Sequence, residues 1–290
     1  MSSTLRPGQQ LPDRTVVGRN TAADEADSIH DDAHAARLGY RGGLVPGVTL
    51  LAYLTPTLIE AFGAAWPQRG RLRARFLRPA YDGETLLCRA TVARAQDGDE
   101  ALDCRLGRAD GSACVEAEAR CSLADRPAET RPWRSAIPVA GPAVPPGGGL
   151  PPLAPEHMAI GQELAPLTYR VSLAESVAWA GAAGDGSAWY RDGSPFGGGP
   201  IVHPAWFARD AIYLLRHNFA YKATIHAATD IAYLGAGWPD RDYTVYGYVV
   251  DLYERKGNGY AVLDTLTVDQ DGREIARNRH TSVITLRGER

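Results

Sequence analysis

Two stretches of this chain place an acidic side chain five positions before a second polar side chain. In the first, Glu25 precedes His30, and in the second, Asp185 precedes Tyr190. A carboxylate and an imidazole can exchange protons with water near neutral pH. A tyrosine with a pKa near ~10 is a poor base, although it can donate a hydrogen bond. The first stretch is therefore the stronger candidate for acid–base chemistry.

The two acidic stretches lead into similar loops. The first is followed by Gly42-Gly43-Leu44-Val45-Pro46-Gly47, and the second by Gly198-Gly199-Pro200-Ile201-Val202-His203-Pro204. An apolar segment comes next in both halves. This repeated order predicts a chain built from two similar units.

The apolar segments are expected to be buried helices. In Val48–Phe62, apolar residues recur every three or four positions, which is the spacing of one helix face. Pro56 is expected to kink or end this helix. The segment Pro204–Leu215 has a similar pattern. A strand meander should follow each helix, because alternating apolar residues flank the turn pairs Asp110-Gly111 and Asp271-Gly272.

The elements suggest a fold and its division into parts. The expected strands are Leu72–Phe76, Thr85–Val92, Ala101–Leu106, Cys114–Cys121, Tyr243–Tyr253, Tyr260–Val268 and Glu274–Leu286. Nine of the 20 prolines fall between Pro127 and Pro155, which predicts a linker. We therefore expect an N-terminal repeat at 10–125, a Pro/Gly-rich linker at 126–159 and a C-terminal repeat at 160–290. The predicted fold class is α+β, with two antiparallel sheets, each wrapped around a long central helix and joined edge to edge.

Composition narrows the classes of function. The 290 residues carry 31 Lys+Arg against 34 Asp+Glu, a net charge of −3, so nothing favours nucleic-acid binding. No secretory signal is visible, and the longest apolar run, near Leu50–Leu54, is too short to span a bilayer, so we expect a cytoplasmic protein with no membrane partner. The four cysteines are separated by 16, 10 and 7 positions without a CxxC pair, which predicts thiols on strands and no metal site.

The two acidic stretches resemble the signature of the MaoC-like hydratases and dehydratases, which include the (R)-specific enoyl-CoA hydratases. That signature is Gly-Asp-x-Asn-Pro-aliphatic-His, followed by a glycine that opens the central helix. Similar stretches here are Gly184-Asp185-Gly186-Ser187-Ala188-Trp189-Tyr190 and Asp24-Glu25-Ala26-Asp27-Ser28-Ile29-His30. The resemblance implies a double hot-dog fold and the addition or removal of water at an enoyl-CoA or enoyl-ACP double bond. It implies no cofactor and is compatible with a homodimer.

The same resemblance assigns roles to individual residues. In the family, the Asp and the His act on one water, and the glycine N–H faces the thioester carbonyl. By resemblance, His30 and Glu25 are catalytic and the Gly47 amide stabilises the enolate oxygen. The substrate-binding candidates are Gly47, Asp27, Val45, Asp185, Tyr190 and His203.

Both halves depart from the family pattern. Glu25 stands where the family has Asp, and Tyr190 stands where it has His. The approach to the acid is also shorter in the first half, because seven residues separate Val17 from Glu25 and 13 separate Val171 from Asp185. A helix before the acid is therefore expected in the second half and missing from the first, and the frame of Glu25 could slip to Asp24 or Asp27.

Three functions stay open. The first is an enoyl-thioester hydratase or dehydratase that uses His30 and Glu25. The second is a catalytically degenerate hot-dog protein that binds an acyl thioester or related small molecule, because neither half keeps an intact Asp–His pair. The third is an altered reaction at Asp185 and Tyr190. Each candidate residue also has a purely structural interpretation. His30 could lie next to a helix cap, Asp185 could form a turn, and His203 could pack at the entrance of a helix.

Overall fold

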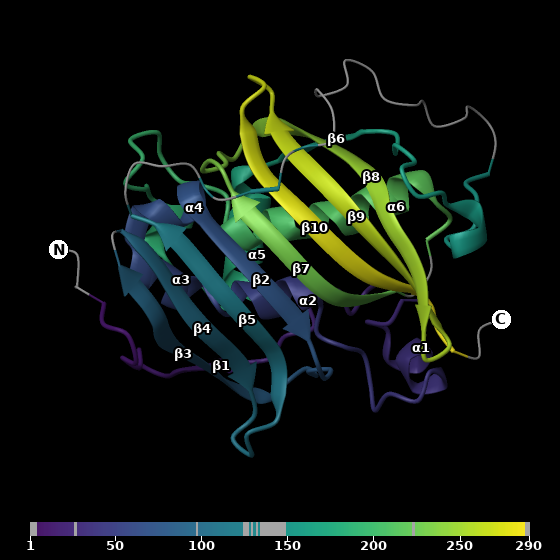
Figure 1. The fold of residues 1–290 in the computed structure, drawn as a ribbon, viewed down its shortest axis with the longest axis horizontal. Coiled ribbons are helices and arrows are strands. Elements are labelled where there is room, and N and C mark those ends of the chain that lie inside the picture. The colour runs from purple at the N-terminus through teal and green to yellow at the C-terminus, as the bar shows by residue number, and fades with distance from the viewer. Residues whose placement is uncertain are drawn as a thin grey trace.

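The computed structural model describes residues 5–25, 28–96, 98–123, 128, 130–131, 133, 149–221 and 224–287. In this part of the chain, ten strands form one sheet in the order β1-β3-β4-β5-β2-β7-β10-β9-β8-β6 (Figure 1). The first half contributes β1 (Arg14–Val17), β2 (Gly70–Phe76), β3 (Thr85–Gln96), β4 (Asp99–Gly107) and β5 (Ala113–Ser122). The second half contributes β6 (Leu167–Val171), β7 (Ile225–Tyr233), β8 (Arg241–Arg255), β9 (Asn258–Asp269) and β10 (Glu274–Thr285).

The sheet is continuous across the two halves because β2 pairs with β7. These strands are antiparallel, in a register that runs from Arg71 opposite Ala232 to Arg75 opposite Ala228. Outward from this seam the two halves have the same strand order, β2-β5-β4-β3-β1 and β7-β10-β9-β8-β6. The predicted pair of repeats joined edge to edge is therefore confirmed.

A buried helical stretch lies under the first half of the sheet. The helices of this half are α1 (Asp32–Arg37), α2 (Gly47–Ala52), α3 (Thr55–Phe62), η1 (Gly63–Ala65) and α4 (Trp66–Arg69). Pro56 lies in the first turn of α3, where its missing N–H costs no hydrogen bond, so the expected kink falls between α2 and α3. Gly47–Arg69 is long and apolar enough to cross a membrane by length and composition, but 61% of its most apolar window is buried inside the fold. Such burial is what a core helix requires.

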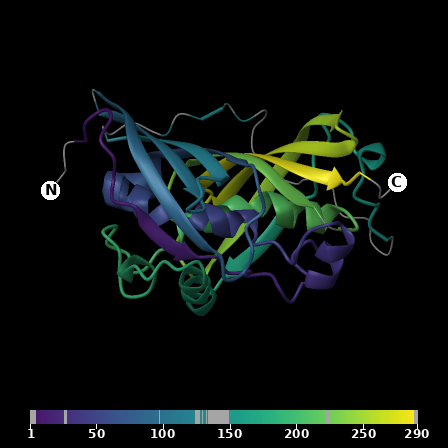
Figure 2. The ribbon, with the colours of Figure 1, turned by 90° about the horizontal axis from the view of Figure 1, so that it is seen from below.

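The second half repeats this arrangement. Its helices are η2 (Pro155–His157), α5 (Leu173–Ala182), η3 (Ala188–Tyr190), η4 (Pro204–Arg209) and α6 (Asp210–Asn218). The expected helix over Pro204–Leu215 thus begins as the 3₁₀ helix η4 and continues as α6. Asp210 fixes α6 to the sheet by accepting hydrogen bonds from Tyr169 at 2.9 Å and Thr267 at 2.6 Å. Burial raises the pKa of Asp210 to about 7. Figure 2 shows α2–α4 of the first half and α5 and α6 of the second half on one side of the sheet.

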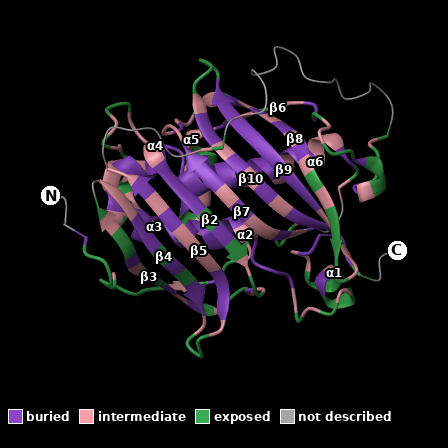
Figure 3. Ribbon diagram, viewed as in Figure 1, coloured by how far each residue is buried: buried purple, intermediate pink, exposed green. Residues whose placement is uncertain are grey.

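Buried residues continue from one half of the sheet to the other. Figure 3 shows them along the strands of both halves, including β9 and β10. Leu51, Leu54 and Leu58 are all fully buried, as the apolar spacing predicted. The four cysteines are free, buried thiols on β3, β4 and β5, which confirms the prediction of thiols on strands.

Some elements were not predicted from the sequence. The expected strands correspond to β2–β5 and β8–β10, whereas β1, β6 and β7 were missed. Helix α5 precedes Asp185, and no helix lies between β1 and Glu25, so the expected difference between the halves is confirmed. Most of the predicted linker, including 134–148, lies outside the described residues.

Candidate functional site

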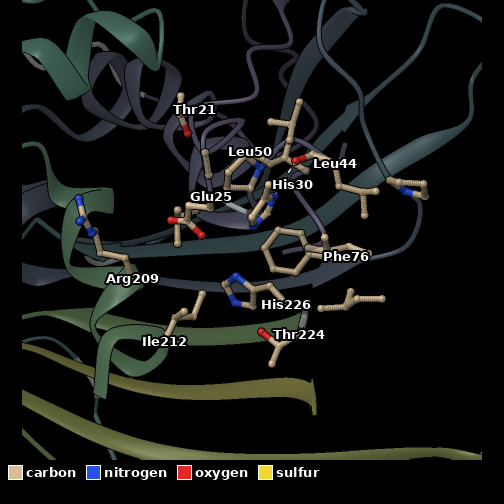
Figure 4. A pocket seen from close by; sticks show the side chains of 18 of the residues that line it. Thr21, Glu25, His30, Leu44, Leu50, Phe76, Arg209, Ile212, Thr224 and His226 are labelled. Carbon is tan, nitrogen blue, oxygen red and sulfur yellow. Dashed lines mark hydrogen bonds between the residues drawn. The ribbon is translucent and has the colours of Figure 1, made fainter. Parts of the chain in front are cut away.

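A cavity of about 330 Å³ lies between the two repeats. The first repeat supplies the loop that carries Glu25 and His30, the start of α2 and the end of β2, and the second repeat supplies α6 and the start of β7. Figure 4 shows Glu25, His30, Phe76 and His226 around the same space. The structure therefore brings the predicted catalytic pair together in one cavity with Gly47.

His30 presents one ring nitrogen to this cavity. Its Nδ1 lies 2.7 Å from the carbonyl oxygen of Leu44. Because a carbonyl only accepts hydrogen bonds, Nδ1 carries a proton and the neutral ring has its lone pair on Nε2. Burial lowers the pKa of His30, against the hydrogen bond to Leu44 and the charge of Glu25, which raise it. A neutral imidazole with an available Nε2 is suited to take a proton from water.

Glu25 is held by an arginine from the other repeat. Arg216 on α6 donates to both carboxylate oxygens, with its Nη1 3.1 Å from Oε1 and its Nη2 in contact with Oε2. The guanidinium also lies over the ring of Tyr221, 4.4 Å from its centroid. This bidentate contact joins residues that are 191 positions apart in the sequence, and it fixes the position of the Glu25 carboxylate. Nothing in the local sequence around Glu25 indicated this partner.

Gly47 lies directly against a histidine that the sequence analysis missed. A side-chain carbon at position 47 would lie 2.7 Å from Nδ1 of His226, so only glycine lets α2 approach β7 this closely. The His226 ring also packs on Phe76 and His280, with centroids 4.3 and 4.1 Å away. Burial and His280 lower the pKa of His226 well below its usual value, so this ring is neutral. Val45, also a predicted contact, lines the same cavity.

The corresponding motif of the second repeat is closed. The buried Asp185 carboxylate accepts hydrogen bonds from the Tyr190 hydroxyl and the Ser187 N–H, both at 3.1 Å. Nε2 of His203 lies 3.3 Å from the same carboxylate, and Nδ1 of His203 accepts the N–H of Ala205. Although burial raises the pKa of Asp185, these partners bring it below its usual value.

The residues of this closed cluster do not line the cavity. Asp185, Tyr190 and His203, which were predicted to bind substrate, instead tie the loop after α5 to the start of η4. The Asp185 carboxylate is thus engaged by groups of the cluster itself. Asp27, the remaining predicted contact, lies outside the described residues. Among the described residues, no three His, Cys, Asp or Glu side chains gather as a metal ion requires.

Comparison with known proteins rests on structure alone, because no protein-family model and no curated protein matches the sequence. A protein described as a MaoC domain protein dehydratase from Chloroflexus aurantiacus J-10-fl matches with a TM-score of 0.74 at 12% identity, over 98% of this chain and 97% of that chain. A conserved protein from Mycobacterium tuberculosis with a double hot-dog fold matches with a TM-score of 0.68 at 14% identity, over 96% of both chains. This chain has a double hot-dog fold.

Proteins with different functional descriptions occur among the structural matches. A protein described as a thioesterase II from Thermobifida fusca YX matches with a TM-score of 0.55 at 14% identity, over 98% of this chain and 96% of that chain. At such identities the matches establish the fold, and the reaction has to be inferred from the residues in the cavity.

Proposed function

We propose that this double hot-dog protein is an acyl-thioester hydratase or dehydratase, which adds water to an enoyl thioester carried on CoA or acyl carrier protein, or removes it. The observation that carries the proposal is the position of His30. Its Nδ1 is engaged by Leu44, its Nε2 is available, and it shares one cavity with Glu25 and Gly47. This arrangement can hold a water between a base and a carboxylate.

In the hydration direction, Nε2 of His30 takes one proton from a water whose oxygen adds to the β-carbon. The Glu25 carboxylate, held by Arg216, accepts a hydrogen bond from the other O–H and so orients the water. The electron pair of the double bond moves to the thioester oxygen, where the N–H of Gly47 stabilises the enolate. His30 then returns its proton to the α-carbon, so that one water is added in total. Oxyanion donors of this kind contribute about 3–4 kcal/mol, and a positioned acid or base about 10²–10⁴-fold in rate.

The first experiment separates hydration from thioester hydrolysis. A panel of enoyl-CoA thioesters is incubated with the protein while the absorbance of the conjugated thioester and the release of free thiol are followed in parallel. We expect absorbance to fall with no thiol release. Thiol release at the same rate would instead indicate a thioesterase, and tight thioester binding with neither signal would indicate a degenerate binding protein.

Variants then test the residues. His30→Ala should lower kcat/KM by about 10²–10⁴-fold with the fold intact, and Glu25→Gln should fall in a similar range. The double variant should be little worse than either single variant, because groups that act on one water are not additive. Tyr190→Phe is the matched control from the closed motif and should cost less than about tenfold, since Tyr190 lies outside the cavity. Loss of turnover in Tyr190→Phe with a tolerated His30→Ala would place the active site in the second repeat.

A further inference from the structure

The cavity carries more positive than negative side chains. Its described lining includes three arginines, Arg78, Arg209 and Arg216, and a single carboxylate, Glu25. Arg216 is neutralised by Glu25, and Arg78 is exposed to solvent. Arg209 is half-buried. No ion pair joins it to a carboxylate among the described residues, and the charges of Glu175 and Asp210 act on it only at longer range. A half-buried guanidinium that lines a ligand-sized cavity is suited to bind an anionic group of a ligand.

Arg209 is held in place by aromatic rings. It lies at the junction of η4 and α6, with its guanidinium 3.9 Å from the centroid of the Trp206 ring and 4.3 Å from that of Tyr213. Its Nη2 donates a hydrogen bond to the Tyr213 hydroxyl. Contact with these rings shields part of the guanidinium from water, and the N–H groups at its edge can still donate to a ligand.

Arg209 and Tyr213 together offer donors suited to a carboxylate. The planar N–H fork of arginine matches the two oxygens of a carboxylate. The Tyr213 hydroxyl accepts the hydrogen bond from Arg209, so its own proton is available for an anion. Both side chains line the same cavity as His30, and Figure 4 shows Glu25 between Arg209 and His30 in that view.

We propose that Arg209 and Tyr213 form a subsite for a carboxylate at the far end of the acyl group, so that the substrate is an enoyl thioester of a dicarboxylic acid. This inference rests on the proposed hydratase function. A carboxylate is favoured over a phosphate of the carrier because Arg209 is half-buried against aromatic rings in the same cavity as His30. Arg78, by contrast, is exposed and suited to a carrier that stays in water. The apolar walls, including Leu50 and Ile212, accommodate the carbon chain between the two ends.

The experiment compares monothioesters of unsaturated dicarboxylic acids with the corresponding methyl esters, which have nearly the same shape but no terminal charge. Each acyl group is presented on CoA and on N-acetylcysteamine, which lacks phosphates. For the wild-type protein, kcat/KM for the free acid should exceed that for the methyl ester by about tenfold to a hundredfold on both carriers, as expected for a hydrogen-bonded charge. In Arg209→Gln this acid-to-ester ratio should fall close to one, and in Tyr213→Phe it should fall in part. Arg78→Gln removes a charge from the same cavity and should keep the ratio.

Several results would overturn the subsite. These are equal kcat/KM for acid and ester in the wild-type protein, an unchanged ratio in Arg209→Gln, or an effect of Arg209→Gln seen with CoA and absent with N-acetylcysteamine. The last result would mean that Arg209 binds a carrier phosphate.

If no enoyl thioester is hydrated, the proposed function fails. Calorimetric binding of a saturated dicarboxylic monothioester then tests the subsite alone. If the free acid binds more tightly than its methyl ester, and this difference is lost in Arg209→Gln, the subsite is supported. Equal binding of the acid and the ester overturns it.

Discussion

At the scale of single residues, contacts with neighbouring groups determine the protonation of His30 and the position of the Glu25 carboxylate in the cavity. Leu44 determines which nitrogen of His30 carries the proton, and burial keeps the ring neutral. Glu25 is one methylene longer than the Asp of the MaoC-like signature, and its carboxylate meets Arg216 from the other repeat. Arg216 therefore positions the longer side chain.

The lowered pKa of His30 predicts the pH dependence of activity. Protonation of Nε2 removes the base, so kcat/KM for hydration should fall as the pH falls, with a midpoint below the ordinary histidine value of 6.5. Steady-state rates between about pH 5 and pH 8 would measure this acid limb, and His30→Ala, with its residual activity, should lack it. A limb centred above the ordinary value would contradict the assignment of a buried neutral base.

At the scale of elements, the helical stretch α2–α4 is the support on which the loop of His30 rests. Its apolar side is buried under β2–β5, and its first residue, Gly47, packs against His226 on β7. The helix thus links the core of the first repeat to the strand of the second repeat that lines the cavity. Truncation of buried side chains such as Leu54 and Leu58 should therefore lower the stability of the fold, because these side chains lie in the core and do not line the cavity.

Truncation of the core side of this stretch should be costly. Leu54→Ala and Leu58→Ala should each lower the free energy of unfolding by about 2–5 kcal/mol, because both side chains are fully buried. Chemical denaturation measures the change. Ile160→Ala is the control, since Ile160 is 64% exposed and its loss should change stability by less than about 0.5 kcal/mol. A cost below about 1 kcal/mol for both leucines would mean that the helix is peripheral.

At the scale of the whole molecule, polar as well as backbone contacts cross the seam between the repeats, so we expect the repeats to unfold as one cooperative unit. Asp230 on β7 accepts hydrogen bonds from Arg71 on β2 at 2.7 and 2.9 Å, and Arg73 and Arg131 lie within 3.2 Å of the same carboxylate. The Glu25–Arg216 pair crosses between the repeats at the cavity. A repeat on its own would lack half of the cavity wall.

Removal of the seam carboxylate should destabilise both repeats together. Asp230→Ala removes the carboxylate that accepts two hydrogen bonds from the nearly buried Arg71, which should cost about 3 kcal/mol or more. Glu116→Ala breaks the exposed Arg75–Glu116 pair on the same sheet, and should cost less than about 1 kcal/mol. Urea unfolding followed by circular dichroism and by tryptophan fluorescence should give coincident single transitions for both variants. Two separated transitions would contradict a single cooperative unit.

The sequence by itself determined the features that depend on local pattern. Apolar spacing identified the buried leucines of α2 and α3, alternation and turn pairs located β2–β5 and β8–β10, and the repeated order of loop, helix and meander indicated two units. His30 was found because its spacing from Glu25 and its place before a helix-opening glycine are local properties. Local patterns report which face of an element is buried, and that face is set by nearby residues.

Only the tertiary structure decided what lies opposite these elements. Strand β7 was missed because its sequence, Ile225–Tyr233, mixes alanines and an aspartate and becomes a strand through pairing with β2 and β10 on its two sides. The sequence also indicated a site at Asp185, Tyr190 and His203. In the folded protein these side chains contact one another in a cluster outside the cavity. The second repeat contributes Arg209, Arg216 and His226 to the cavity, and these residues are far along the chain from Glu25 and His30. Their contacts depend on how the two repeats pack together, and residue spacing within one repeat does not predict them.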